Sequence, residues 1–439
     1  MKDLDIVLLN DSFPPLIDGV ANTVKNYARV LKHDNGNPIV ITPENPDAKD
    51  EQFDYPVIRY PGLDVRKFIG YFAGNPFSPS VVKSLNDKNF SLFHSHCPFA
   101  STMLSRCLRD IYDKPIVMTY HTKFDIDIRK ALHTKLLQEE MIDLIIDNIN
   151  SCDEVWVVSN GAGKNLKSLG YKGDYIVMNN GVDIPKGRLI EDEYMLYTKD
   201  YDLPKDVPIF LFVGRLMWYK GIKIIIDALS GLKSQDYDFR MIFIGKGQDE
   251  NEIKKYAKDS KVIDKCIFTG PIYDREKLKA FYCRSNLFLF PSDFDTNGLV
   301  VREAAAMSLP SVLLQNSAAS EGVTKNVDGF MINENPASLS ALLVRLISDL
   351  NMVKKVGENA ANNLYLSWED AIKVAEDRYE IVQENYKLGK YPRKKGLSAA
   401  YYQLQANWMD SISNIKKFKQ LIKDELEASF FSDIDYPNR

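Results

Sequence analysis

Short apolar runs alternate with segments of helical spacing along most of the chain. Continuous runs of four or five Val, Ile, Leu and Phe residues are typical of parallel strands that are buried on both faces. The predicted strands are Ile6–Leu9, Ile39–Thr42, Leu92–Phe93, Ile116–Tyr120, Val155–Val158, Ile176–Met178, Ile209–Val213, Met241–Ile244, Cys266–Phe268, Leu287–Phe290 and Val312–Leu314. The helices predicted between them lie at residues 20–33, 99–111, 221–233, 249–260, 274–285 and 338–349. This alternation predicts an α/β protein built from doubly wound parallel sheets.

The alternation is interrupted once, by the polar segment 185–208. We interpret this segment as the connection between two Rossmann-like halves of similar size. Ligands of such sheets bind beyond the carboxyl ends of the strands, so two facing halves would form one central cleft. After Trp368 the pattern is helical only. The predicted boundaries are 1–190 for a first domain, 191–207 for a linker, 208–366 for a second domain, 367–390 for a helix and 391–439 for a helical tail.

Composition is that of an ordinary soluble globular protein, with 45% apolar and 26% charged residues. The net charge of −4 gives no support for nucleic acid as a partner. No apolar run approaches the ~20 residues of a spanning helix, and residues 1–5 lack the apolar region of a signal peptide. Five scattered cysteines without a C-x-x-C pair predict reduced thiols and a cytoplasmic location.

Two carboxylates, Asp295 and Glu303, stand eight residues apart around a glycine that precedes an apolar helix start. Ionised carboxylates only accept hydrogen bonds, which suits the hydroxyl groups of a sugar. The free backbone N–H groups of a helix that begins after Gly298 would suit a phosphate. The segment therefore predicts a site for a ligand that carries both hydroxyl and phosphate groups.

Two cations flank the loop that follows the predicted strand Ile209–Val213. Gly214 permits a tight exit from the strand. Arg215 and Lys220 would then clamp a diphosphate, the first as a bidentate donor and the second as a point charge. A solvated loop with two surface charges is an equally good interpretation of these residues alone. The nearby Gly245–Gly247 resembles half a dinucleotide-binding fingerprint and by itself indicates only a turn.

In the first half, Gly19 and His121 each follow a predicted strand. Gly19 would let backbone N–H groups approach a phosphate, although a plain turn explains it as well. His121 ends its strand at the expected edge of the cleft, where a binding role competes with a structural one. His94 and His96 share one face of another strand, but no third ligand at a telling spacing accompanies them, so we expect no metal.

Cations and aromatic residues interleave at residues 64–72. Such a segment would suit a membrane interface, which accepts both aromatic rings and cationic side chains. A partly buried loop or a short helix is the alternative. The candidate residues for contact with an acceptor or a membrane are Arg66, Lys67, Phe68 and Tyr71.

Together these motifs resemble those of the retaining glycosyltransferases of family 4, which have the GT-B fold. The resemblance covers residues 4–390. It rests on Gly214-Arg215-Leu216 with Lys220-Gly221, and on Asp295-x7-Glu303, which matches the family's Glu-x7-Glu. Shorter motifs at residues 15–20, 119–125 and 318–323 are similar to those of bacterial diacylglycerol α-glucosyltransferases.

The resemblance implies a role for each matching residue. The first domain would bind the acceptor, the second the nucleotide sugar, and the helix 367–390 would return to the first domain. Arg215 and Lys220 would contact the donor diphosphate, and Glu303 the ribose. Asp295 and His121 would act on the transferred sugar. The other donor-binding residues would be Gly19, Gly214, Ile272, Asn297, Gly298, Leu299 and Val300.

The chain departs from the family pattern at three positions. Asp295 is one methylene shorter than the family's glutamate, a change that bears on activity and on the choice of sugar. Asn297 stands where the family has an aromatic or small residue, and Ser308 where it has a glycine. None of these changes removes the cations or Glu303.

The expected activity is transfer of a hexose, with retention and without a metal, from a nucleotide-diphosphate sugar to an acceptor hydroxyl. UDP-glucose is the expected co-substrate, with no other cofactor. A diacylglycerol-type lipid at the inner face of the cell membrane is the expected acceptor. Alternatives are a polysaccharide or protein acceptor, a nucleotide-sugar epimerase or phosphorylase on a similar scaffold, and a catalytically silent partner subunit of the same fold.

Overall fold

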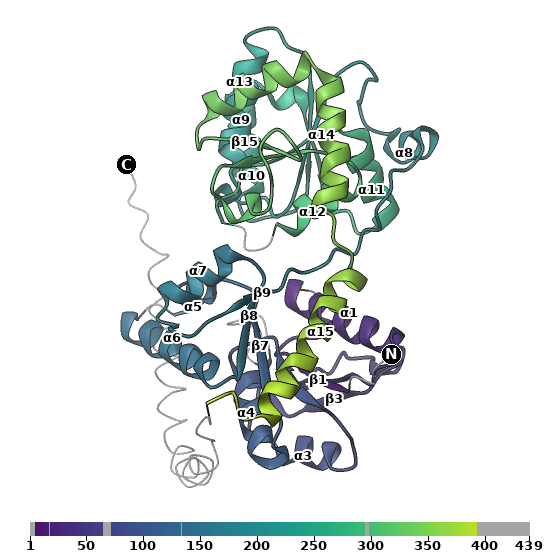
Figure 1. Ribbon diagram of the computed structural model, residues 1–439. Coiled ribbons are helices and arrows are strands. Elements are labelled where there is room, and N and C mark those ends of the chain that lie inside the picture. The colour runs from purple at the N-terminus through teal and green to yellow at the C-terminus, as the bar shows by residue number, and fades with distance from the viewer. Residues whose placement is uncertain (1–4, 17, 65–71, 133, 295–297, 393–439) are drawn as a thin grey trace. The chain divides into compact units, whose positions relative to one another are not determined.

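The computed structural model describes residues 5–16, 18–64, 72–132, 134–294 and 298–392. They form two compact units (Figure 1). The first unit contains the residues up to Trp156, then Asn165–Ile176, and the chain from Glu376 onward. The second contains Val157–Lys164 and Val177–Ala375. The chain therefore passes from one unit to the other four times.

A seven-stranded sheet with the order β3-β2-β1-β6-β7-β8-β9 forms from the first part of the described chain. The pairs β1–β2, β1–β6, β2–β3 and β6–β7 are parallel. The strands are β1 Ile6–Leu9, β2 Ile39–Pro43, β3 Val57–Tyr60, β6 Leu92–Ser95, β7 Ile116–Tyr120, β8 Glu154–Val157 and β9 Ile176–Val177. A separate antiparallel pair joins β4 Gly62–Asp64 to β5 Phe72–Gly74.

Helices follow most strands of the first sheet. They are α1 Gly19–His33, the 3-10 turn Asp50–Gln52, α3 Pro79–Leu85, α4 Ala100–Tyr112, α5 Phe124–Ala131, α6 Lys135–Asn150 and α7 Asn160–Ser168. A last helix, α15 Trp368–Lys387, begins in the second unit and ends in the first. Within the first unit it packs Tyr379 against Trp156, with ring centroids 5.2 Å apart.

The second unit contains a six-stranded sheet with the order β12-β11-β10-β13-β14-β15, and all of its pairs are parallel. The strands are β10 Ile209–Val213, β11 Arg240–Ile244, β12 Cys266–Gly270, β13 Leu287–Phe290, β14 Ser311–Leu314 and β15 Phe330–Ile332. The order reverses between β10 and β13, and ligands of doubly wound sheets bind at such a switch point.

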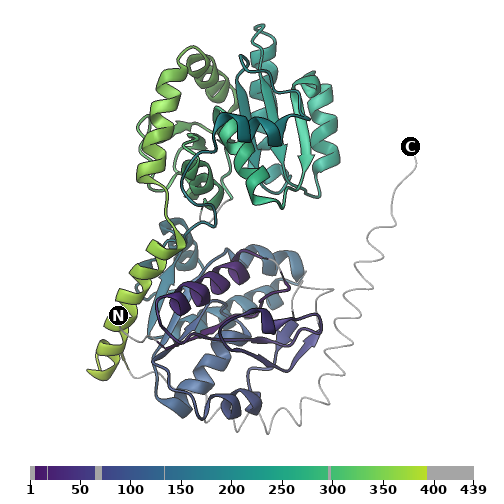
Figure 2. The same cartoon turned by 90° about the vertical axis from the view of Figure 1, so that its right-hand side faces the viewer.

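Helices cover both faces of the second sheet (Figure 2). They are α8 Glu191–Thr198, α9 Ile222–Lys233, α10 Glu250–Asp259, α11 Arg275–Arg284, α12 Leu299–Ala306, α13 Pro336–Ile347 and α14 Leu350–Asn363, with 3-10 turns at Trp218–Lys220, Ile263–Lys265 and Ala318–Ser320. Their apolar faces and the strands form one core, in which Phe212, Phe243 and Phe290 are buried. Burial on both faces explains why most positions of these strands are apolar.

The predicted α/β class with two doubly wound parallel sheets is confirmed. Four short strands were not predicted, namely β3, β4, β5 and β15. β3 and β15 lie at sheet edges, and β3 carries Arg59, whose guanidinium pairs with Asp50 at 2.7 Å. Edge strands of three or four residues carry too little apolar sequence to produce a clear signal.

Residues 191–207, which we predicted to be a linker, instead begin with helix α8 and pack within the second unit. Tyr201 contacts Phe281 of α11, with ring centroids 5.1 Å apart. The guanidinium of Arg284 donates to the carbonyl oxygens of Leu203 and Pro204 at 2.6 and 2.7 Å. The segment is polar because α8 lies at the surface. Three acidic residues in its first turn favour a helix N-terminus.

Candidate active site

The loop that carries the predicted cations touches the segment that leads into α12. Gly221 has φ +76°, and a Cβ atom there would lie 1.9 Å from the carbonyl oxygen of Pro291. Only glycine fits such an approach. The contact brings the loop after β10 against the loop after β13, which are neighbouring strands. The two halves of the predicted donor site are therefore adjacent at one sheet edge.

Lys220 and Arg215 differ in their surroundings. Lys220 is only 9% exposed, and its Nζ lies 5.4 Å from the centroid of the Phe290 ring. This packing restricts the ammonium group to a small volume beside the loop after β13. The side chain of Arg215 is exposed and forms no ion pair within the described part of the chain. An anion at this edge would meet one fixed cation and one adaptable cation.

The turns after β10 and β11 are packed together through glycines. A Cβ atom at Gly245 would lie 1.9 Å from the carbonyl oxygen of Gly214, and one at Gly247 would lie 2.0 Å from that of Leu216. The N–H of Leu216 donates to the carbonyl oxygen of Lys246 at 3.2 Å. The Gly-Lys-Gly turn thus supports the backbone of the cation loop, a role that its weak resemblance to a fingerprint did not predict.

Glu303 lies in α12, and its side chain is 16% exposed. The hydroxyl of Tyr282 donates a hydrogen bond to Glu303 Oε2 at 3.0 Å, and Arg275 Nη1 lies 3.8 Å from Oε1. Burial raises the pKa of the Glu303 carboxyl, while the bond from Tyr282 and the charge of Arg275 act in the opposite direction. The carboxylate is thus held in place with acceptor capacity to spare, as a ribose ligand requires.

The helix start beside these groups has the predicted form. Gly298 is buried and caps α12 with φ +60°, a left-handed conformation that favours glycine. Leu299 and Val300 form the first turn and are half-buried. Ile272 follows β12 at the same carboxyl edge and packs against the core of the second unit. The predicted residues Asp295 and Asn297 lie outside the described residues.

In the first unit, His121 directly follows β7, as predicted. Its Nε2 lies 2.9 Å from Nδ1 of His96, which follows β6. Burial lowers the pKa of His121 to about 3, so the ring is neutral at pH 7. His94 and His96 do share one face, with ring centroids 4.0 Å apart. Both nitrogens of His94 are engaged, by the hydroxyl groups of Tyr379 and Thr119.

Gly19 begins α1, but its neighbour Asp18 already occupies the helix N-terminus. The N–H groups of Val20 and Ala21 both donate to Asp18 Oδ1 at 2.8 Å. A Cβ atom at Gly19 would have no heavy atom within 4 Å. There is space for a ligand, but an anion here would share the helix start with a carboxylate.

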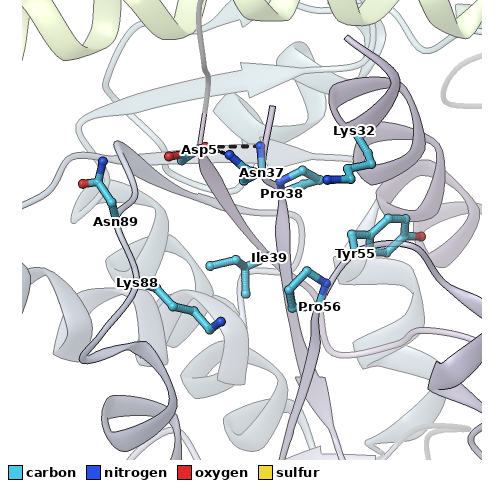
Figure 3. Close-up of a pocket in the computed structure, with 9 residues that line it drawn as sticks. All are labelled: Asp5, Lys32, Asn37, Pro38, Ile39, Tyr55, Pro56, Lys88 and Asn89. Carbon is cyan, nitrogen blue, oxygen red and sulfur yellow. Dashed lines mark hydrogen bonds between the residues drawn. The ribbon is translucent and has the colours of Figure 1, made fainter. Parts of the chain in front are cut away.

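The remaining candidates concern the acceptor. Arg66, Lys67, Phe68 and Tyr71 lie outside the described residues. A cavity of about 400 Å³ in the first unit is lined by Lys32, Ile39 and Tyr55, among others (Figure 3). It opens at the amino ends of the strands, because Ile39 is the first residue of β2. It therefore lies at the opposite edge of the sheet from His121.

No single helix among the described residues is both long and apolar enough to cross a membrane. Helices α13 and α14 together would be long and apolar enough to cross a membrane, but the pair is bent by 105°. Both bury side chains in the core of the second unit, including Leu343 and Val353.

Three residues of the site were not predicted in their roles. Tyr282 and Arg275 hold Glu303, and His96 bonds to His121. Helical spacing places Tyr282 on the buried face of α11, but only the fold brings α11 beside α12. His96 was considered with His94 as a metal pair, a role that we did not expect, and nothing in its spacing indicates a neighbour 25 residues away.

Two protein-family models match this chain, one in its first half and one in its second. Residues 17–186 match the family described as Glycosyltransferase Family 4, and residues 196–363 match Glycosyl transferases group 1. A GDP-mannose-dependent alpha-mannosyltransferase of Corynebacterium glutamicum is 24% identical, over 76% of this chain and 78% of its own length. The alpha-monoglucosyldiacylglycerol synthase of Acholeplasma laidlawii is 24% identical, over 77% of this chain and 87% of its own. Its counterpart in Streptococcus pneumoniae is 20% identical, over 82% and 83%.

Solved structures show the same fold. A glycosyltransferase from Rickettsia africae superimposes with a TM-score of 0.69 at 20% identity, over 88% of this chain and all of that one. Anabaena HepE in complex with UDP-glucose does so with a TM-score of 0.67 at 16% identity, over 87% of this chain and all of that one. Two parallel-sheet units, the two family matches and relatives along most of the chain agree. The protein is a glycosyltransferase of family 4 with the GT-B fold.

Proposed function

We propose that the protein transfers glucose from UDP-glucose, with retention and without a metal, to the hydroxyl group of a diacylglycerol-type lipid. The contact between Gly221 and Pro291 carries the proposal, because it gathers Lys220, Arg215 and the start of α12 at the switch point of one sheet. Two relatives are alpha-monoglucosyldiacylglycerol synthases, which supports glucose as the sugar and the lipid as the acceptor.

The reaction follows from the charges at this edge. As the bond between the anomeric carbon and the diphosphate breaks, negative charge grows on the leaving phosphate. Lys220, Arg215 and the N–H groups of α12 stabilise that charge, and such electrostatic stabilisation is usually the largest single contribution to catalysis. The departing phosphate accepts the proton of the acceptor hydroxyl, and the new bond forms on the same face of the sugar. Glu303 holds the ribose, and His121 contacts the transferred sugar.

The cations are tested by the double substitution Arg215→Ala with Lys220→Ala. Loss of one such donor typically costs about 10²–10³ in rate, so we expect transfer to fall at least 100-fold and UDP binding to weaken. The control is Lys354→Ala with Lys355→Ala, which removes the same charge from exposed positions on α14 of the same unit. Equal activity in the two double variants would refute the role of the cations.

The donor and the metal are tested in the wild-type protein. UDP-glucose should raise the unfolding midpoint more than GDP-mannose, and an excess of EDTA should leave transfer unchanged. The GDP-mannose-dependent relative makes mannose the specific alternative. A larger rise of the unfolding midpoint with GDP-mannose would contradict UDP-glucose and identify GDP-mannose as the donor. Absence of binding to either, measured by calorimetry, would favour a silent subunit.

The acceptor is tested by product formation and by binding to vesicles. Diacylglycerol in vesicles that contain an anionic lipid should yield a glucolipid, and the protein should float with the vesicles. The double change Arg66→Ser with Lys67→Ser should reduce flotation if the segment 64–72 docks at the lipid interface. A glucosylated polysaccharide in place of the glucolipid would contradict the lipid acceptor while leaving the transfer itself in place.

A further inference from the structure

Two neutral imidazoles share one hydrogen bond at the end of β7. His96 Nδ1 and His121 Nε2 are 2.9 Å apart, and the two rings stack with centroids 5.2 Å apart. Burial lowers the pKa of His121 to about 3 and holds the pKa of His96 well below its usual range. Each ring therefore carries one N–H, and one proton lies between the two facing nitrogens. Either His96 donates this proton or His121 does.

The second nitrogen of His96 distinguishes the two arrangements. Its Nε2 is fully enclosed and has no hydrogen-bond partner in the part of the chain that the structure describes. The rings of Tyr27 and His94 pack against His96, with centroids 5.2 and 4.0 Å away, and an aromatic ring accepts an N–H only weakly. If His121 donated, His96 would bury an N–H at Nε2 without an acceptor, which is rare in folded proteins.

His94 does not supply the missing acceptor. Its Nε2 lies 2.7 Å from the hydroxyl of Thr119, and its Nδ1 bonds to the hydroxyl of Tyr379. Both nitrogens are thus already engaged. The arrangement with a lone pair at Nε2 of His96 leaves no buried donor unpaired. It requires that His96 carry its proton on Nδ1.

We propose that His96 is a positioning residue, which donates from Nδ1 to Nε2 of His121 and so holds His121 in the Nδ1–H tautomer. His121 remains 6% exposed, its hydrogen bond to His96 uses Nε2, and its Nδ1 is not among the described polar atoms that are both enclosed and without a partner. The ring therefore offers a fixed N–H donor at the carboxyl edge of the first sheet. It suits an oxygen acceptor, namely a hydroxyl of the transferred sugar. The identity of this ligand rests on the proposed function, whereas the tautomer does not.

The tautomer is read directly by nitrogen NMR of the full chain labelled with ¹⁵N-histidine, with His121→Gln as the variant that assigns the signals. We expect His121 to show a protonated Nδ1 and an unprotonated Nε2 at pH 7. A protonated Nε2 on His121 would overturn the proposal, whatever the enzymatic activity of the sample.

Two substitutions separate hydrogen bonding from packing. His96→Asn retains an N–H near the position of Nδ1, so it should preserve the tautomer of His121 and most of the transfer activity. His96→Leu removes the donor and should release the tautomer, with kcat/KM lower by about tenfold, the effect of about one hydrogen bond. Equal signals and equal kcat/KM in the two variants would refute the positioning role.

The experiment also separates this inference from the proposed function. A wild-type protein with the Nδ1–H signature but no transfer from UDP-glucose would overturn the function and support the tautomer. Transfer from UDP-glucose by a protein whose His121 is protonated on Nε2 would support the function and overturn the tautomer. Because the wild-type spectrum decides the tautomer, the test holds even if His96→Leu fails to fold.

Discussion

At the scale of single residues, the donor side of the site depends on backbone contacts that only glycine permits. Gly221 holds the cation loop against Pro291, and Gly245 and Gly247 hold the next turn against that loop. These positions leave no space for a side chain, so the loop holds its cations in place only because glycine has no Cβ atom. Replacing one of these glycines therefore tests the packing of the loop.

Gly221→Ala should destabilise the protein more than Gly270→Ala. Both glycines have a positive φ, +76° and +73°, but a Cβ atom at Gly270 has no heavy atom within 4 Å. The left-handed strain, about 1–2 kcal/mol, is therefore common to both variants. The clash with Pro291 is unique to Gly221 and should add about 2 kcal/mol or more. Thermal unfolding measures the difference, and equal midpoints would show that the loop moves away freely.

The buried histidines predict how stability depends on pH. His94, His96 and His121 are neutral in the folded protein because burial lowers their pKa values. The unfolded chain binds protons near the ordinary pKa of about 6.5. Stability is therefore present above that pH and lost as the pH falls, by at most about 1.4 kcal/mol per unit and per histidine.

Urea unfolding between pH 7.5 and 5 measures this slope. His96→Asn should reduce it, since one of the three groups no longer titrates. The control is His33→Asn at a surface position, where the side chain is 81% exposed and pairs with Asp34 at 2.9 Å, so this change should alter the slope less than His96→Asn does. A slope that is unaffected by His96→Asn would show that the ring is not neutral in the fold.

Candidate site residues could be predicted where a local sequence motif identifies them. They could not be predicted where only the packing of distant elements brings them to the site. Arg215, Lys220 and Glu303 were named from local motifs, because a strand end followed by a turn fixes their edge of the sheet. The partners of Glu303, Tyr282 and Arg275, come from a different helix. Their selection depends on how α11 packs beside α12, and no spacing in the chain encodes that packing.

At the scale of elements, helix α15 joins the rest of the first unit through a partly buried ion pair. Arg378 donates to both carboxylate oxygens of Glu154 at 2.8 and 2.7 Å. Trp156 Nε1 donates to the same carboxylate at 2.6 Å. Glu154 begins β8, the neighbour of the edge strand β9, so one side chain connects this strand to α15.

Glu154→Ala should lower the stability of the first unit by about 1–3 kcal/mol, since it leaves the donors of Arg378, Trp156 and Tyr391 without their acceptor. The side chain of Arg378 is 30% exposed, so water compensates for part of the loss. The control is Glu139→Ala on α6 of the same unit, whose pair with Lys135 is exposed and should hardly shift the midpoint. Thermal unfolding followed by circular dichroism compares the two variants.

Elements were predicted best where they are buried on both faces. The bounds of β1, β7, β10 and β13 agree with the predicted runs residue for residue, since strands buried on both faces contain few polar positions that would obscure the pattern. α8 and β3 were missed for the opposite reason. α8 lies at the surface, where polar residues are compatible with a helix, a strand or a loop, and β3 is a half-buried edge strand whose short apolar run is interrupted by Arg59.

At the scale of the whole molecule, the predicted nucleotide contacts from Gly214 to Glu303 all belong to the second unit. UDP should therefore slow hydrogen exchange in peptides of residues 214–221, 245–247 and 298–303. At 100 times its dissociation constant it should stabilise the folded state by about 2.7 kcal/mol. The double variant with Ala at positions 215 and 220 should lose most of this protection. Protection confined to the first unit would contradict the site.

The four crossings between the units have a consequence for biosynthesis. The second unit is made almost entirely from Val177–Ala375, a stretch of about 200 residues that lies within the sequence of the first. At about 5–20 residues per second, the ribosome needs about 10–40 s to complete it. Throughout that time Glu154 and His94 lack Arg378 and Tyr379, their partners on α15. The unit that is begun first is thus finished last, and its nascent form keeps these polar groups and the Trp156 ring uncovered until α15 emerges.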